Sequence, residues 1–181
     1  MTIYYAGIGA RKTNSKYLSY ITSLGKYFAQ KGYVLRSGGA NGADSAFEEG
    51  CDLVNGQKEI YLPWCDFNNN KSSLYDLPNF QEAFKIAESF HPAWYSQSQA
   101  VKKLHTRNSY QVLGSDLQTP SLFVVCYTDG TGGTMQALRI AKSYNIPVFN
   151  LKLEKNLFQT DPDIYGEYIE SKVGLMSTTH R

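Results

Sequence analysis

Two glycine-rich turns, each between an apolar, strand-like run and a helix-like run, constrain what this chain can fold into. They are residues 37–44 (SGGANGAD) and 129–134 (DGTGGT), and a third turn, residues 6–11 (AGIGAR), follows the first apolar run. Where a strand ends in small residues and a helix begins, backbone N–H groups and the positive end of the helix dipole point at one place. Such a place favours a bound anion, so the sequence predicts a phosphate-bearing ligand.

The composition is that of an ordinary folded domain. The chain has 181 residues, of which 42% are hydrophobic and 19% charged, and this length can bury a core without cross-links. We therefore expect one domain over residues 1–181, with a core at 3–151 and a C-terminal extension at 152–181. The formal net charge of +2 is too small to indicate nucleic-acid binding, because strong duplex binders usually carry a concentrated basic face.

The cysteines and the N-terminus exclude other classes of protein. Cys51, Cys65 and Cys126 are odd in number, far apart and without a C-x-x-C pair, which indicates neither a disulfide framework nor a metal site. We expect no metal and no resident cofactor. The first residues lack the pattern of a signal peptide, and no run approaches the ~20 apolar residues needed to cross a bilayer. We therefore expect a cytoplasmic protein without membrane contact.

Apolar patterns alternate between strand-like and helical spacing along the chain. They predict strands at 3–6, 33–35, 59–63, 121–127 and 146–149, and helices at 17–29, 43–50, 80–90, 96–114, 135–141 and from 161 onward. The strand at 121–127 is expected to be central, 64–76 to be a long loop, and 177–181 to be frayed. Alternation of this kind predicts a Rossmann-like α/β three-layer sandwich with a mainly parallel sheet of about five strands.

Ligands of such sheets bind at the carboxyl ends of the strands, where the winding reverses, and all three glycine turns fall at that edge. Thr131 and Thr134 add hydroxyls that can bond phosphate oxygens, and arginines can neutralise the phosphate. Each turn could also be only a tight connection, and each arginine a surface ion pair. The candidate ligand residues are Gly7, Gly9, Arg11, Arg36, Ser37, Gly38, Gly39, Asn41, Gly42, Asp44, Arg107, Asn108, Asp129, Gly130, Thr131, Gly132, Gly133 and Thr134.

Three carboxylates could take part in catalysis if the chain is an enzyme: Asp44, Glu48 and Asp129. Asp44 and Glu48 are four residues apart and share a helix face. Asp44 either complements the helix dipole or accepts hydrogen bonds from a ribose or a base. His105 is expected to be structural.

Four blocks together resemble the SLOG superfamily: residues 5–11 (YAGIGAR), 35–44 (LRSGGANGAD), 105–108 (HTRN) and 130–134 (GTGGT). That superfamily contains the Rossmann-like domain of DNA-processing protein A and the Lonely Guy phosphoribohydrolases. The resemblance covers about residues 3–151 in block order, and it implies a Rossmann-like fold, nucleotide binding and a homo-oligomer. Stand-alone members occur among phage and mobile-element genes, and some bind signals made from NAD in antiviral defence.

The two branches of the superfamily imply different functions. The DNA-processing branch is the more similar, through Ser37-Gly38, Gly42-Ala43-Asp44 and Arg107-Asn108, and it implies binding of single-stranded DNA. The Lonely Guy branch has a glutamate three residues after the Gly-Thr of its glycine block, where this chain has Ala137. That difference argues against an enzyme. We expect a sensor or sequestering protein for a nucleotide or an NAD- or ADP-ribose-derived molecule, with N-glycosidic-bond hydrolysis and single-stranded DNA binding as alternatives.

Overall fold

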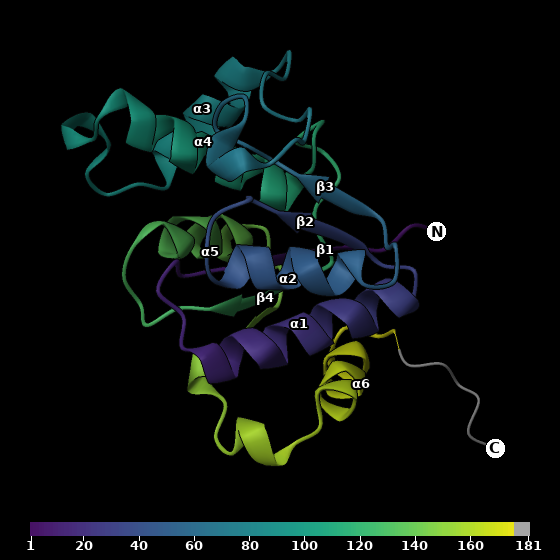
Figure 1. Cartoon of the computed structure of the whole chain (residues 1–181). Coiled ribbons are helices and arrows are strands. Elements are labelled where there is room, and N and C mark those ends of the chain that lie inside the picture. The colour runs from purple at the N-terminus through teal and green to yellow at the C-terminus, as the bar shows by residue number, and fades with distance from the viewer. Residues whose placement is uncertain (176–181) are drawn as a thin grey trace.

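The computed structural model describes residues 1–175 and contains a five-stranded sheet whose pairings are all parallel (Figure 1). The strands lie in the order β3-β2-β1-β4-β5. They are β1 (Tyr4–Gly9), β2 (Val34–Ser37), β3 (Lys58–Ile60), β4 (Phe123–Tyr127) and β5 (Val148–Asn150). The Rossmann-like α/β fold predicted from the sequence is therefore confirmed. The end predicted to fray, 177–181, lies outside the described residues.

Helices cover both faces of the sheet. They are α1 (Ser15–Gln30), α2 (Ala43–Asp52), α3 (Phe80–Ser89), α4 (Gln99–Leu113), α5 (Gly133–Ser143) and α6 (Pro162–Lys172). In Figure 1, α1, α2 and α6 lie on one side of the strands, and α3, α4 and α5 on the other. The Asn14 side chain accepts the N–H of Lys16 and so caps α1, a role that asparagine favours. No helix within residues 1–175 is both long and apolar enough to span a bilayer.

Two hydrophobic cores flank the sheet because successive side chains of a strand point to opposite faces. Tyr5 enters the core beneath α1 and α2, where its ring centroid lies 4.8 Å from that of Phe28. Ala6 and Ile8 enter the second core, beneath α4 and α5. A Cβ on Gly7 would lie 2.7 Å from Cγ of Phe47, so Gly7 is needed for α2 to approach β1.

Strand β1, and not β4, occupies the middle of the sheet. The run at 121–127 was expected to be central, and β4 is indeed interior and buried along its whole length. However, the chain winds outward from β1 through β2 to β3 and then returns to place β4 on the other side of β1. The winding therefore reverses between β1 and β4, which puts the expected ligand crevice at their carboxyl ends.

The last helix is fixed to the domain by a buried carboxylate. Glu170 of α6 is 5% exposed and accepts hydrogen bonds from the hydroxyls of Tyr27 on α1 and Tyr33 before β2. Burial, and then the hydrogen bond to Glu170, raises the pKa of both tyrosines. Residues far apart in sequence thus hold α6 against α1.

Candidate functional site

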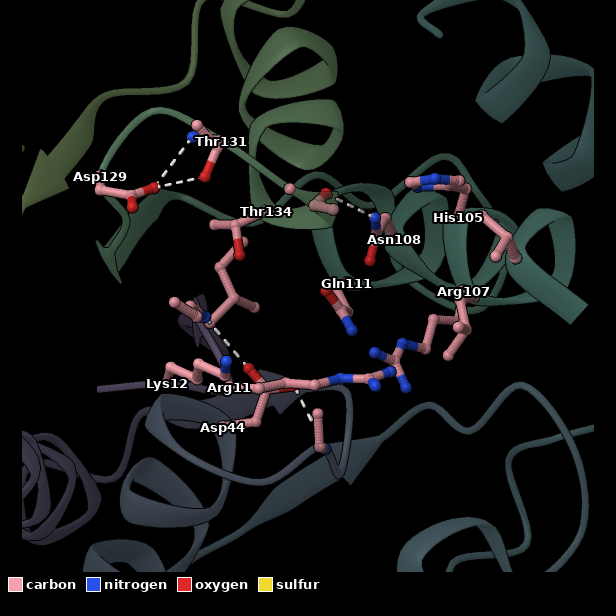
Figure 2. Close-up of a pocket in the computed structure, with 18 residues that line it drawn as sticks. Arg11, Lys12, Asp44, His105, Arg107, Asn108, Gln111, Asp129, Thr131 and Thr134 are labelled. Carbon is pink, nitrogen blue, oxygen red and sulfur yellow. Dashed lines mark hydrogen bonds between the residues drawn. The ribbon is translucent and has the colours of Figure 1, made fainter. Parts of the chain in front are cut away.

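A cavity of about 430 Å³ opens at the carboxyl ends of the strands, where the winding reverses (Figure 2). Four segments line it: the turns after β1, β2 and β4, and one face of α4. Ten of the predicted ligand residues are brought together in its lining: Gly9, Arg11, Asp44, Arg107, Asn108, Asp129, Thr131, Gly132, Gly133 and Thr134.

Most of the glycine turn at residues 37–44 does not line the cavity: only its residues Ala40 and Asp44 belong to the lining. The Ser37 hydroxyl donates to the carbonyl of Gly7 at 2.6 Å, which ties β2 to β1. The Glu48 carboxylate accepts from Lys58 at 2.8 Å, away from the cavity. The candidates that the structure leaves outside the lining are Gly7, Arg36, Ser37, Gly38, Gly39, Asn41, Gly42, Gly130 and Glu48.

Arg36 does not face the ligand edge, and this corrects the expectation that three arginines meet there. Its side chain is 2% exposed, and its Nε donates to Glu59, the residue paired with it on β3, at 3.0 Å. Its Nη1 donates to the carbonyl of Thr119 at 2.6 Å. The guanidinium also stacks over the ring of Tyr4, 4.0 Å from the centroid. Arg36 therefore holds the sheet to the chain that precedes β4.

Asp44 is a buried carboxylate in the cavity wall. It is 4% exposed and accepts the backbone N–H of Gly9 at 3.1 Å and of Ala40 at 3.4 Å. Burial raises the pKa of Asp44 to about 6, against the lowering effect of Arg107 and of these N–H groups. A carboxyl group that titrates near neutrality and opens onto a cavity can bind a ligand hydroxyl or exchange a proton with it.

Arg107 projects from α4 into the same part of the cavity. Its Nη1 donates to the carbonyl of Gly38 at 2.7 Å, and its guanidinium lies 5.0 Å from the ring centroid of Phe67. Its Nε is buried without a hydrogen-bond partner among the described residues. Burial, opposed by the charge of Asp44 and assisted by that of Arg11, lowers the pKa of Arg107 to about 10. Figure 2 shows the exposed Arg11 side chain extending toward Arg107.

The turn after β4 leads into α5 at the opposite wall. Gly132 is the N-cap of α5 and, having no side chain, leaves the first turn of the helix without a side-chain cap. The Asn108 amide donates to the carbonyl of Gly133 at 3.2 Å and to Gln136 at 2.9 Å, which fixes this turn to α4. Asp129 accepts the N–H and hydroxyl of Thr131, which lower the pKa of its carboxyl group. Asp129 is exposed and lies on the rim.

Several lining residues were not predicted as ligand residues from the sequence. Lys12 adds a further exposed cation beside Arg11, and Val101 and Leu104 supply an apolar surface on α4. Gln111 also lines the cavity, and it lies four residues after Arg107. Residues at that spacing share a helix face, so the position of Arg107 was a signal that could have identified Gln111.

His105 lines the cavity and also packs in an aromatic cluster. Its ring centroid lies 4.5 Å from that of His91 and 6.3 Å from that of Trp94. Burial, and to a smaller extent the nearby His91, lowers the pKa of His105 to about 4. The imidazole of His105 is thus neutral at pH 7.

Asp44 and His105 should make opposite contributions to the pH dependence of stability. Folding raises the pKa of Asp44 to about 6. The stability that protonation of Asp44 contributes is therefore lost as pH rises from about 4 to 6. Folding lowers the pKa of His105 to about 4, so its contribution is lost as pH falls from about 6.5 to 4. Between pH 4 and 6 the two effects should nearly cancel.

As the pH is lowered, the free energy of unfolding of Asp44→Asn should therefore fall more steeply than that of the wild type. The free energy of unfolding of His105→Gln should instead rise as the pH is lowered. Urea denaturation from pH 4 to 6.5 measures these slopes, each of which should differ from wild type by up to about one proton per molecule. Parallel pH profiles for all three proteins would contradict the assignment.

Comparisons with known proteins give a fold but no family match. Neither a scan against protein-family models nor a search of curated proteins finds a match. DNA processing protein A of Helicobacter pylori, described for its mode of single-stranded DNA binding, superposes with a TM-score of 0.54 and 19% identity. The superposition covers 94% of this chain and 73% of that chain.

The molybdenum cofactor carrier protein of Chlamydomonas reinhardtii superposes with a TM-score of 0.56 and 17% identity, over 96% of this chain and 99% of that chain. At these identities the likeness shows the fold. The structure and these comparisons therefore establish that the chain has a Rossmann-like α/β fold, which it shares with these two proteins.

Proposed function

We propose that the protein binds a nucleotide or a nucleotide-derived molecule, such as one made from NAD or ADP-ribose, as a sensor or a sequestering protein. The observation that carries the proposal is the meeting of three cations, Arg11, Lys12 and Arg107, with the N-terminus of α5 in one cavity. Its volume of about 430 Å³ is in the range of small-molecule sites.

The phosphate is best accommodated between the first turn of α5 and the turn after β1. The glycine N-cap leaves backbone N–H groups of that first turn open to an anion. The Thr134 side chain lies beside them, facing the cavity (Figure 2). Arg11 and Lys12 are exposed and without salt bridges among the described residues, so they are available to pair with phosphate oxygens.

The rest of the ligand would extend over α4. Val101 and Leu104 offer an apolar surface to a base, while the buried Asp44 carboxylate can accept hydrogen bonds from the sugar or base. This division matches the usual construction of small-molecule sites, in which apolar walls carry a few precisely placed polar groups.

Binding without turnover is favoured by the position of Ala137. It replaces the glutamate of the Lonely Guy block, is fully buried in the second core and lies outside the cavity lining. No carboxylate therefore stands where that enzyme family would need one.

Arg11→Ala should weaken ligand binding at least tenfold without loss of stability, because a charge-assisted hydrogen bond contributes about 1.5–3 kcal/mol and Arg11 is exposed. Native mass spectrometry of molecules retained through purification would identify the ligand, and calorimetry would give its affinity. Lys103→Ala is the matched control, because Lys103 is an exposed cation of α4 outside the cavity lining. Equal losses in the two variants would contradict the proposed phosphate site.

A second candidate, hydrolysis of an N-glycosidic bond, is favoured by one observation: Asp44 is buried in the cavity wall with its pKa raised to about 6, a value suited to acid–base catalysis. Incubation with a panel of nucleotides and NAD, followed by chromatography, would detect release of a free base. Retained binding without any released base would exclude this activity. Titration with a labelled single-stranded oligonucleotide at low salt tests the DNA-binding alternative.

A further inference from the structure

The side chain of Gln111 is buried, polar and directed at the cavity. The residue is 2% exposed, yet it lines the cavity, and Figure 2 shows its amide pointing into the open space. Within residues 1–175 this amide makes no hydrogen bond, whereas the neighbouring Asn108 amide on the same helix donates two. The amide is therefore reached from the cavity, where a bound molecule or water can satisfy it.

Gln111 belongs to a group of polar side chains gathered around Gly38. A Cβ on Gly38 would collide with the Gln111 amide nitrogen and would lie 2.9 Å from Oδ2 of Asp44 and 3.0 Å from Nε of Arg107. The absence of a side chain at Gly38 therefore makes room for all three groups. We call Asp44, Arg107 and Gln111 the polar floor of the cavity.

Two members of the polar floor are already held by the protein, and Gln111 is not. Asp44 accepts backbone N–H groups and Arg107 donates to the carbonyl of Gly38. The Gln111 amide can still donate two hydrogen bonds and accept others. Beside the Asp44 carboxylate, it forms a pair that can satisfy a ligand group carrying donors and acceptors together.

We infer that Gln111, together with Asp44, binds the cis-diol of a ribose and makes the cavity selective for ribonucleotides over deoxyribonucleotides. This inference rests on the proposed nucleotide binding. Each hydroxyl of a cis-diol both donates and accepts: Asp44 can accept from one hydroxyl, while the Gln111 amide donates to the other. With the phosphate at the α5 N-terminus and the base over Val101 and Leu104, the sugar between them is the part of the ligand left to meet the polar floor.

A ligand that lacks one hydroxyl leaves a buried polar group of the floor unpaired. Sites built to bond a hydroxyl discriminate strongly against analogues without it, because the unpaired group keeps its desolvation cost. The wild-type protein should therefore bind a ribonucleotide at least tenfold more tightly than its 2′-deoxy counterpart, and also more tightly than its 3′-deoxy counterpart.

Calorimetric titration with AMP, GMP, their 2′-deoxy counterparts and 3′-deoxy-AMP tests the inference on the wild-type protein. Gln111→Met, which keeps the length of the side chain but not its hydrogen bonds, should reduce the ratio of ribo to deoxy affinity at least fivefold. Gln81→Met, on the exposed part of α3, is the matched control and should leave the ratio unchanged. Thermal unfolding checks that the variants fold.

Each outcome has a distinct meaning. A wild-type protein that binds both members of each pair equally overturns the inference and leaves nucleotide binding standing, even if Gln111→Met fails to fold. An unchanged ratio in a folded Gln111→Met also overturns the role of Gln111. Absence of binding to every nucleotide and deoxynucleotide of the panel overturns the proposed binding of mononucleotides and the inference with it.

Discussion

Gly133→Asp should weaken the binding of phosphorylated ligands at least a hundredfold while leaving the domain folded. Gly133 is the first residue of α5 and lines the cavity. A Cβ there would have its nearest contact with Cε1 of His105 at 3.7 Å, an ordinary van der Waals distance. An aspartate in the first turn of a helix complements the dipole and contributes about 0.3–1 kcal/mol to stability. The substitution therefore fits the fold.

The same carboxylate would occupy the place proposed for the phosphate. Two like charges about 4 Å apart near a protein surface repel by about 4 kcal/mol, so the affinity for a nucleotide should fall at least a hundredfold. Gly133→Ala is the control, since it adds a side chain without charge and should bind almost as tightly as wild type. Calorimetry measures affinity, and thermal unfolding measures stability. Undiminished binding by Gly133→Asp would show that the phosphate lies elsewhere.

Glu170→Ala should cause a large loss of stability. It would leave the hydroxyls of Tyr27 and Tyr33 without their partner inside the domain. An unsatisfied buried polar group costs about 1–3 kcal/mol, so the two together should lower the free energy of unfolding by about 2–6 kcal/mol. Urea denaturation followed by circular dichroism provides the measurement.

Glu167→Ala gives the matched comparison, because Glu167 lies on the exposed face of the same helix, α6. It should change stability by no more than about 0.5 kcal/mol. Glu170→Gln should fall between the two, since an amide keeps the shape and can bond both hydroxyls. If Glu170→Ala were as stable as Glu167→Ala, the buried carboxylate would not be what fixes α6 to α1.

The fold was predictable because its signals are local. The glycine turns and the apolar runs mark where elements begin and end, and alternation of strand and helix specifies a parallel sheet. The central place of β1 was missed, because the order of strands depends on where the chain reverses its winding. The apolar run of β4 shows only that this strand is covered on both faces.

The parts of the candidate site that depend on backbone turns and on charge could be predicted from the sequence. The parts that depend on the register between neighbouring strands could not. Arg11 and the turn before α5 were found from the glycine pattern, and Arg107 from the resemblance of residues 105–108 to the DNA-processing branch. Arg36 was misplaced because its partner Glu59 lies on a neighbouring strand, and their pairing depends on a register that the sequence does not display. The helix predicted at 96–114 corresponds to α4, whose buried part includes Arg107 and Gln111, which line the cavity.

The two walls of the cavity differ in how freely they could diverge during evolution. A Cβ at Gly9 would meet the carbonyl of Tyr127 at 2.6 Å, and Asp44 ties the turns after β1 and β2 together, so a change there requires compensating changes elsewhere. A Cβ at Gly130 or Gly132 would meet nothing within 4 Å, but both residues have positive φ angles of +95° and +79°, so this turn has room for a longer backbone and still resists point substitution. New ligand preferences should therefore arise first by insertion or lengthening in the turn after β4, with the opposite wall inherited almost unaltered.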